Sequence, residues 1–433
     1  MRDTGFFFGS YGRVGVGSNL RGGTPEGVAV VGRGTRIVQP SYVEMDAYYR
    51  FKGLNGKKIT TVTTLAMADA LFHYTGEFSS RLTLRNLYAI ANINDETGLW
   101  MGSRMYRGDD IYLLDFWPLD DVNTVGAGAW YDTGKLRINV HAGLNRLLDP
   151  FQYQVKAVAD PVFGSEEVVQ LDRQRFIATT HTTYRFHGPP TGPAMKVKAY
   201  AEIQALPEGT RIREDDTTET LAADFGYAVG LQFGAWLPKL ANHLGNSHIN
   251  VFARFAQGLS AFDELQLPEG FNDDRQLFPK AKELLFGVSA NYEFPRGGVL
   301  AGGYARRFVD ADINDQDRDD GWQYIAAIRP HLTLIDSFQG ALDLSYQKKL
   351  PRGISPTALV ALDPAVFQIA PMLIYSPMGG GSYARPQFRF YYRAAHLNDG
   401  ARDLYPLDDP RRQRKWVHFL GVQAEWWFNS TYR

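Results

Sequence analysis

The sequence contains no cysteine, so a disulfide framework, a thiolate metal site and a cysteine nucleophile are all excluded. It also lacks an excess of positive charge, because 46 Lys and Arg residues stand against 47 Asp and Glu residues. A nucleic-acid-binding protein usually carries a basic excess. We therefore expect no nucleic-acid partner.

Long hydrophobic runs are missing as well. No run approaches the roughly 18 apolar residues that a membrane helix needs. The first residues, Met1 to Thr4, lack an apolar signal region, so either the protein is cytosolic or a signal peptide has been removed. Composition does not separate these two cases, whereas the pattern along the chain does.

The chain is rich in glycine and aromatic residues, with 43 Gly, 27 Phe, 23 Tyr and 8 Trp, and its apolar and polar residues alternate in many stretches. In residues 42–51 every odd position is apolar and every even position is polar or tyrosine, a period of two that is typical of a half-buried β-strand. The same alternation occurs in 6–17, 82–85, 136–144, 197–204, 224–233, 249–255, 286–294, 338–347 and 420–428. No stretch of comparable length shows a helical period, so the sequence predicts an all-β fold.

The connections between these strands alternate between short turns and long polar segments. Short turns lie at 54–56, 132–134 and 295–298, and long segments rich in Asp, Arg and Pro lie near 145–172, 259–283, 308–321, 349–367 and 394–415. Short turns at one end and long loops at the other are typical of a transmembrane antiparallel barrel with periplasmic turns and extracellular loops. Because backbone polar groups in lipid must pair internally, the sheet must close. We expect one barrel domain over residues 1–433, in the bacterial outer membrane, from which a signal peptide has been removed.

One stretch, Trp100 to Asp121, combines charges with rings in an unusual way. Its interior, Ile111 to Trp117, is too apolar for a solvated loop, and its flanks are too charged for a core strand. A segment folded into a water-filled cavity satisfies both halves, because the charges keep water or a polar ligand while the rings pack or stack. The alternative is a surface loop with a few buried anchors.

Several aromatic residues fall on the polar face of their strands, where a lone ring facing water is costly. They are Tyr11, Tyr42, Phe252, Tyr383 and Trp427. Each ring alone is explained equally well by packing under an inward-folded loop. Together, flanked by Arg, Asp and Glu, they suit the passage of sugars, whose apolar faces stack on rings and whose hydroxyl groups bond to charges.

These residues resemble the maltoporin and sucrose-porin family of trimeric, eighteen-stranded sugar channels, and the resemblance covers nearly the whole chain. The stretches that carry it are Phe8 to Gly17, Ser41 to Met45, Trp100 to Asp121, Tyr383 to Pro386 and Gly421 to Phe428. The resemblance implies about 18 strands, a homotrimer, and a third loop, about 104–124, that folds inward and sets the constriction. It implies no cofactor and no metal.

The resemblance also implies site residues. The aromatic slide falls on Tyr11, Tyr42, Tyr383 and Trp427, with Phe252 added from its strand parity, and the neighbouring subunit lends Tyr74 or Phe78. The polar track falls on Arg13, Arg36, Glu44, Arg85, Arg107, Asp110 and Asp115, and Trp117 takes the place of the constriction tyrosine. Gly108 stands where the maltoporins have a track arginine, and the slide is rich in tyrosine. From the resemblance as a whole we expect facilitated diffusion of oligosaccharides such as maltodextrins or similar sugars, and these departures set the chain apart from the maltoporins.

Two alternatives remain at this point. In a general diffusion porin the same charges set ion selectivity only and the rings are packing. A barrel-borne enzyme is disfavoured, because the chain has neither a Gly-x-Ser-x-Gly elbow nor a His-Glu-x-x-His pair around its nine histidines.

Overall fold

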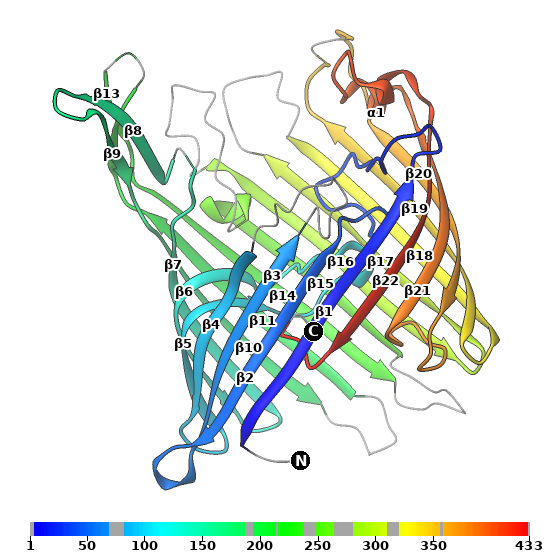
Figure 1. Ribbon diagram of the computed structural model, residues 1–433, viewed down its shortest axis with the longest axis horizontal. Helices are drawn as coiled ribbons and strands as arrows, with labels where there is room; N and C mark the ends of the chain where they lie inside the picture. The colour runs from blue at the N-terminus through cyan, green and yellow to red at the C-terminus, as the bar shows by residue number, and fades with distance from the viewer. Residues whose placement is uncertain are drawn as a thin grey trace.

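The computed structural model describes residues 4–68, 82–149, 151–186, 194–213, 215, 217–237, 247–263, 280–309, 320–355 and 358–431. Eighteen strands form one antiparallel sheet (Figure 1). They are β1 Gly5–Ser18, β2 Tyr42–Lys52, β3 Lys58–Ala68, β4 Leu82–Asn92, β5 Thr97–Arg107, β6 Asp121–Asp132, β7 Leu136–Asn145, β10 Arg175–Phe186, β11 Ala194–Leu206, β14 Asp224–Leu237, β15 Ser247–Gly258, β16 Lys282–Phe294, β17 Gly297–Val309, β18 Gly321–Ile335, β19 Phe338–Pro351, β20 Ala365–Tyr375, β21 Gln387–Leu397 and β22 Trp416–Phe428.

The sheet closes on itself because β1 pairs with β2 on one side and with β22 on the other. Tyr11 therefore lies opposite Glu44 in one ladder and opposite Trp427 in the next. Closure gives each of the 18 strands a neighbour on both sides, as a strand-built membrane protein requires. The predicted closed antiparallel barrel of about 18 strands is confirmed.

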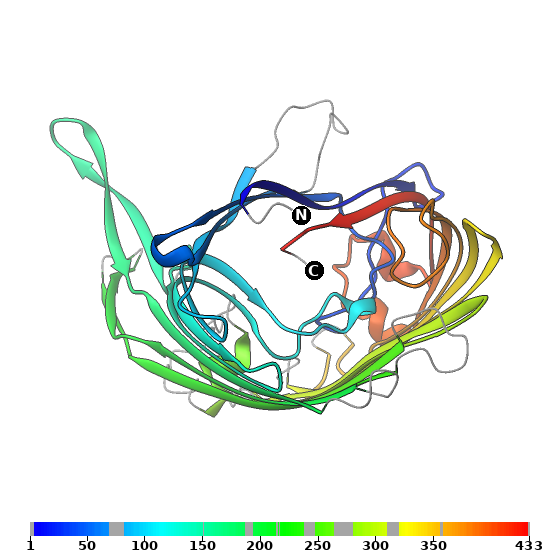
Figure 2. The ribbon, with the colours of Figure 1, turned by 90° about the horizontal axis from the view of Figure 1, so that it is seen from below.

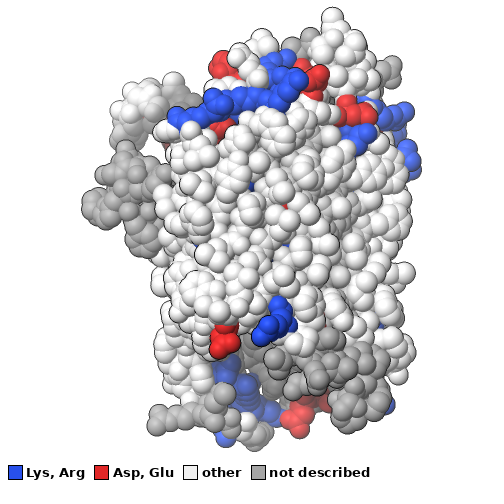
Figure 3. Space-filling view, turned by 90° about the vertical axis from the view of Figure 1, so that its right-hand side faces the viewer, with Lys and Arg blue, Asp and Glu red and all other residues white. Residues whose placement is uncertain are grey.

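The alternation of apolar and polar residues sorts side chains to the two faces of the wall as predicted. Phe6 is 67% exposed and Leu231 is 59% exposed on the outer face, whereas Glu44 and Gln347 on the inner face are fully buried. Figure 3 shows the outer surface of one side, where charged residues lie mostly toward the two ends and leave a largely uncharged band between them. Such a band matches the hydrocarbon layer of a membrane.

The alternation is interrupted at a β-bulge in β4, and the register also shifts near the end of β18, between Thr333 and Ile335. Thr64 of β3 pairs with Asn86 and Leu65 pairs with Leu84, so Arg85 has no partner in the ladder. The side chains of Arg85 and Asn86 both contact inner-face residues, and Leu87 returns to the outer face at 52% exposed. A bulge adds one residue and resets the parity of the strand beyond it.

The connections are short at one end of the barrel, such as 93–96, 133–135 and 295–296, and long at the other, such as 19–41, 108–120 and 146–174. Two of the long connections contain their own hairpins, β8 Tyr153–Asp160 with β9 Gly164–Asp172, and β12 Gly209–Ile212 with β13 Thr218–Leu221. Helical segments are brief: η1 Leu54–Gly56, η2 Tyr112–Leu114, η3 Leu259–Phe262, α1 Asp399–Asp403 and η5 Pro410–Gln413. Among the described residues, no helix is long and apolar enough to cross a membrane.

Two long connections fold into the barrel instead of standing above it (Figure 2). We call residues 19–41 the first loop and residues 108–120 the third loop. The third loop is shorter than the predicted 104–124, because residues 104–107 belong to β5 and 121–124 to β6. The β4–β5 ladder stops at Leu87 and Ser103 while the β5–β6 ladder continues to Arg107 and Asp121, so the end of this hairpin has left β4.

Candidate functional site

Four aromatic rings from three strands and the third loop gather inside the barrel. Tyr11, Tyr42, Trp117 and Trp427 pack in one cluster, which we call the ring cluster. The Tyr11 and Tyr42 ring centroids are 6.0 Å apart. All four rings point inward, as their strand parity or loop position predicts, although they lie up to 416 positions apart in sequence.

Charged side chains surround the Tyr42 ring. The guanidinium groups of Arg13 and Arg85 lie 5.4 Å and 5.5 Å from its centroid. Arg85 forms an ion pair of 2.8 Å with Glu44, which also accepts a hydrogen bond from the Tyr42 hydroxyl. Cations over a ring face are electrostatically favourable, so the charges and the ring form one unit.

Asp115 links the third loop to the wall and to the first loop. Its carboxylate lies 3.7 Å from both Arg13 and Arg36, and Arg36 donates a hydrogen bond of 2.8 Å to the Tyr11 hydroxyl. Asp115 has a left-handed backbone with φ 53°, which aspartate tolerates better than most residues. The predicted track residues Arg13, Arg36, Glu44, Arg85 and Asp115 therefore meet around the ring cluster.

A buried cluster of guanidinium groups around Glu425 was not singled out from the sequence. Glu425 is 2% exposed and pairs with Arg385 at 2.8 Å, with Arg36 at 3.5 Å and with Arg389. Arg385 also lies 3.9 Å from the centroid of the Trp427 ring. The inward parity of Arg389 and Glu425 is visible in the sequence, but their convergence depends on the pairing of β21 with β22.

Two of the predicted slide rings lie outside the ring cluster. Phe252 is 1% exposed and packs with Ile111 in a larger apolar cluster, which Trp427 also contacts. Tyr383 is not on a strand, because β21 begins at Gln387, after Pro386, which cannot donate to a ladder. Its ring instead contacts Tyr112 and stacks on His248, with centroids 5.2 Å and 6.0 Å away.

The remaining predicted residues occupy several places. Arg107 pairs with Asp121 at 3.0 Å and lies 3.9 Å from the Trp117 ring centroid, so it joins the ring cluster. Asp110 lies in the third loop, two positions after Gly108. Tyr74 and its alternative Phe78 lie outside the described residues.

Accessibility differs among the four rings of the cluster. Tyr11 is fully buried and Trp117 is 6% exposed, whereas Tyr42 and Trp427 are only partly buried. A solute in the lumen can thus touch Tyr42 and Trp427, while Tyr11 supports them from behind.

The first loop is an inner-wall element that sequence reasoning missed. Val28, Val30 and Val31 are buried in the apolar cluster that also contains the tip of the third loop. The Arg36 backbone N–H donates to the Leu113 carbonyl at 3.1 Å, which ties the two loops together. The sequence signal that could have predicted this element is an apolar run between glycines inside a long polar connection.

Two cavities open along the lumen beside the third loop and share Asp120. One, of about 440 Å³, includes Lys196 and Lys198 of β11, and the other, of about 190 Å³, includes Tyr200 and Glu202. Because β11 runs from the short-turn end to the long-loop end, the first cavity lies nearer the short turns. We call it the lower cavity and the second the upper cavity.

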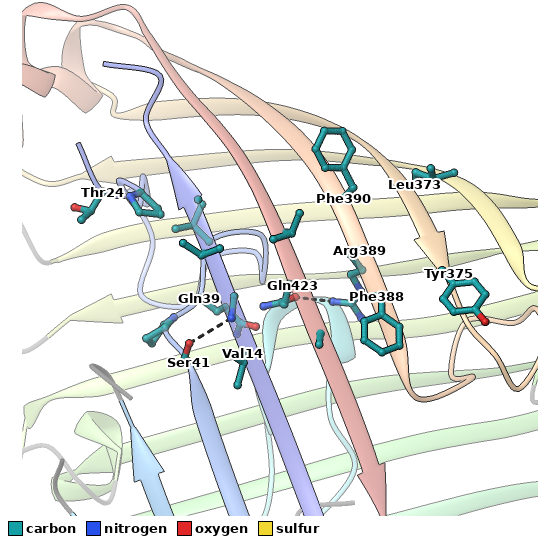
Figure 4. Close-up of a pocket in the computed structure, with 18 of the residues that line it drawn as sticks. Val14, Thr24, Gln39, Ser41, Leu373, Tyr375, Phe388, Arg389, Phe390 and Gln423 are labelled. Atoms are coloured by element: carbon teal, nitrogen blue, oxygen red, sulfur yellow. Dashed lines mark hydrogen bonds between the residues drawn. The ribbon is translucent and has the colours of Figure 1, made fainter. Parts of the chain in front are cut away.

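A larger hollow, of about 1020 Å³, lies at β1, β20, β21 and β22 rather than at the rings (Figure 4). Its lining includes the outward-facing residues Val16, Leu373, Phe388 and Phe390, which belong to the apolar band of the wall. This outward-facing part suits hydrocarbon, whereas Gln39, Arg389 and Gln423 add polar groups to the rest of the lining. Among the described residues, no group of side chains is placed to hold a metal ion.

Asp120 offers a test of the electrostatics at the third loop. Burial opposes its ionisation, but the Lys198 ammonium at 2.8 Å and the His181 ring at 3.1 Å hold the pKa of Asp120 at about 2. A carboxyl whose pKa falls on folding stabilises the folded state above its unfolded pKa, near 4, and loses that contribution as the pH drops toward 2. We expect the difference in unfolding midpoint between the parent and Asp120→Asn to shrink between pH 4 and pH 2. A constant difference over that range would contradict the ion pair.

Comparison with known proteins gives one family and a set of solved structures. The LamB porin family matches residues 6–428. Comparison with curated proteins found no match. Similar structures include the outer-membrane channel DcaP of Acinetobacter baumannii, with 11% identity, 98% of each chain covered and a TM-score of 0.48. They also include OccAB1 of Acinetobacter baumannii, with 7% identity, 98% of this chain and 96% of that chain covered and a TM-score of 0.48. A third is Wzi of Escherichia coli, an outer-membrane protein involved in group 1 capsule assembly and a carbohydrate-binding β-barrel, with 10% identity, 96% of this chain and 83% of that chain covered and a TM-score of 0.43.

Proposed function

The chain belongs to the LamB porin family and is an outer-membrane channel, and we propose that this channel conducts saccharides past the ring cluster. The family points to a channel rather than an enzyme. The saccharide preference, the aromatic slide, the homotrimer and the extent of the domain over 1–433 are parts of this proposal.

The observation that carries the proposal is the meeting of rings and charges at one place in the lumen. Tyr42 and Trp427 present partly exposed rings, and Arg13, Arg85 and Asp115 present hydrogen-bonding groups beside them. A sugar ring has an apolar face and a polar edge, so it can stack on the former while its hydroxyl groups bond to the latter. Several weak contacts in series allow entry without trapping.

A general diffusion pore is the second candidate, and one observation favours it. Tyr11 and Phe252 are buried at 0% and 1% exposed, so both rings act as packing in this structure. If Tyr42 and Trp427 act in the same way, the charges alone set ion selectivity. Liposome swelling and current block over a series of neutral saccharides separate the candidates, because a general pore shows no block at millimolar sugar.

Removal of the accessible rings is the direct test. We expect Trp427→Ala and Tyr42→Ala each to weaken sugar-dependent current block by about 3- to 10-fold, because each ring contact contributes on the order of 1 kcal/mol. The open-channel conductance should change little. Tyr49→Ala is the matched control, since Tyr49 lies on the outer face of the same strand as Tyr42 and is 54% exposed.

Equal sugar affinity in the parent and in both ring variants would contradict the slide. Tyr11→Ala is less suitable for this purpose, because Tyr11 is fully buried and its loss leaves a cavity behind the other rings. The subunit number is tested separately by the mass of the folded protein in detergent, for which we expect a trimer.

A further inference from the structure

The lower cavity is unusually rich in cations. Its lining includes six Arg and Lys side chains and only two carboxylates, Asp109 and Asp120. The basic residues are Arg104, Arg107, Arg137, Arg185, Lys196 and Lys198. They come from four strands of the wall, β5, β7, β10 and β11, so the concentration of charge is a property of the fold and not of one segment.

Carboxylates around the cavity neutralise part of this charge. Asp109 and Asp120 pair with Lys196 and Lys198 at 2.6 Å and 2.8 Å, and Asp121 pairs with Arg107 at 3.0 Å. Asp132 is shared by Arg137 at 3.5 Å and Arg185 at 3.2 Å. His181 also faces Asp120. Six cations therefore meet four carboxylates, and the cavity keeps an excess of positive charge.

Arg104 is the cation that has no carboxylate partner among these ion pairs. In the part of the chain that the structure describes, no carboxylate lies within ion-pair distance of it. Its guanidinium instead lies 4.9 Å from the ring centroids of Tyr88 and Trp100 and 4.7 Å from that of Tyr106. The rings hold the guanidinium in place without using its hydrogen-bond donors for an ion pair, so those donors are available to a solute.

The upper cavity lacks this excess. Asp120 and Asp121, which also line it, are the carboxylates already paired with Lys198 and Arg107. Its other charged lining residues balance, with Arg33 and Arg254 against Glu202 and Asp263. The excess of positive charge thus lies on the short-turn side of the third loop, and an anionic group is favoured in the lower cavity over the upper one.

We propose that the lower cavity is a binding site for the carboxylate of an acidic saccharide, with Arg104 as the principal donor. A planar guanidinium matches a carboxylate through two parallel hydrogen bonds. Tyr106 and Trp236 line the same cavity, with Arg104 and Lys196 over their rings, so a sugar bound to these cations lies beside an aromatic surface. The inference rests on the proposed saccharide function for its ligand class, and it adds a charged preference that the ring cluster alone does not supply.

The test compares current block by a galacturonic acid disaccharide with block by maltose, each added in turn to the two sides of a planar bilayer. In the parent we expect the acidic sugar to block more strongly, and faster from the short-turn side. Arg104→Gln should weaken block by the acidic sugar about tenfold, the effect of one charge-assisted contact, and leave maltose block unchanged. Arg104→Lys should restore part of the difference. Arg146→Gln is the matched control, because Arg146 does not line the cavity and is 41% exposed.

Several results would overturn the site. One is that Arg104→Gln changes current block by both sugars equally, or changes neither. Another is that the acidic sugar does not block the parent channel. A third is that sodium acetate blocks as strongly as the acidic sugar. Maltose block that persists while the acidic sugar fails would leave the proposed saccharide function intact. Loss of maltose block alone would remove the slide and leave the acidic site standing.

Discussion

Glu425→Gln should lower the free energy of unfolding of the barrel by about 3–5 kcal/mol, the usual cost of removing one partner from a buried ion pair. Glu425 is 2% exposed, and Arg36, Arg385 and Arg389 all point at its carboxylate. Without the negative charge, three guanidinium groups face one another in a volume that water barely reaches. The same change should also loosen Arg36, which holds the first loop to the wall.

The measurement is the midpoint of heat or denaturant unfolding of the folded barrel in detergent, followed by single-channel conductance in a bilayer. We expect a lower midpoint together with larger current fluctuations, because the first loop loses an anchor. Asp399→Asn is the matched control: it also removes a carboxylate from an arginine, but that carboxylate is 79% exposed and its pair contributes little. An unfolding midpoint equal to that of the parent would show that the arginines find other partners.

The wall of the barrel could be predicted from sequence because its signal is local. Alternation over ten residues decides which side chains face lipid, and closure follows from the need to pair every backbone group. The bulge at Arg85 escaped prediction, since one extra residue in β4 is recognised only against the register of β3. The sequence of β4 alone therefore did not show which residues after Arg85 face inward.

The interior of the channel was predicted in part. Tyr11, Glu44 and Trp427 were assigned correctly to the inner face, and their contact follows once β1 closes between β2 and β22. The first loop was missed because its partners are distant: Arg36 meets Leu113, Tyr11 and Glu425, and no local pattern encodes these contacts. Tyr383 was predicted to lie on a strand because polar and apolar residues alternate around it. The strand instead begins after Pro386, at Gln387.

The third loop is held inside the barrel by an apolar pocket on the far wall, which we call the seat. Substitutions at this seat give the second prediction with a large effect. Ile111 is fully buried and lies against two glycines of the wall, Gly287 and Gly302. A Cβ atom at Gly302 would lie 2.7 Å from the Ile111 Cγ2 atom, and one at Gly287 would lie 3.0 Å from its Cδ1 atom. The glycines thus provide the space that the isoleucine fills.

Ile111→Asp should release the third loop from this seat, because an unpaired carboxylate cannot remain in an apolar pocket and the packing of the isoleucine, about 2–5 kcal/mol, is lost with it. Asp115 and Trp117 would leave the ring cluster together with the loop. We therefore expect a higher single-channel conductance and the loss of sugar-dependent block, while the strands of the wall remain folded by circular dichroism.

Gly302→Val tests the same seat from the wall, since the added side chain takes the place of Ile111 without adding charge. It should raise conductance in the same direction but to a smaller extent. Leu407→Asp, at a residue that is 72% exposed in an outer connection, is the control for adding a carboxylate to a loop. If conductance and sugar block in Ile111→Asp equal those of the parent, the third loop is held by its ion pairs at Asp115 and Asp120 rather than by its apolar tip.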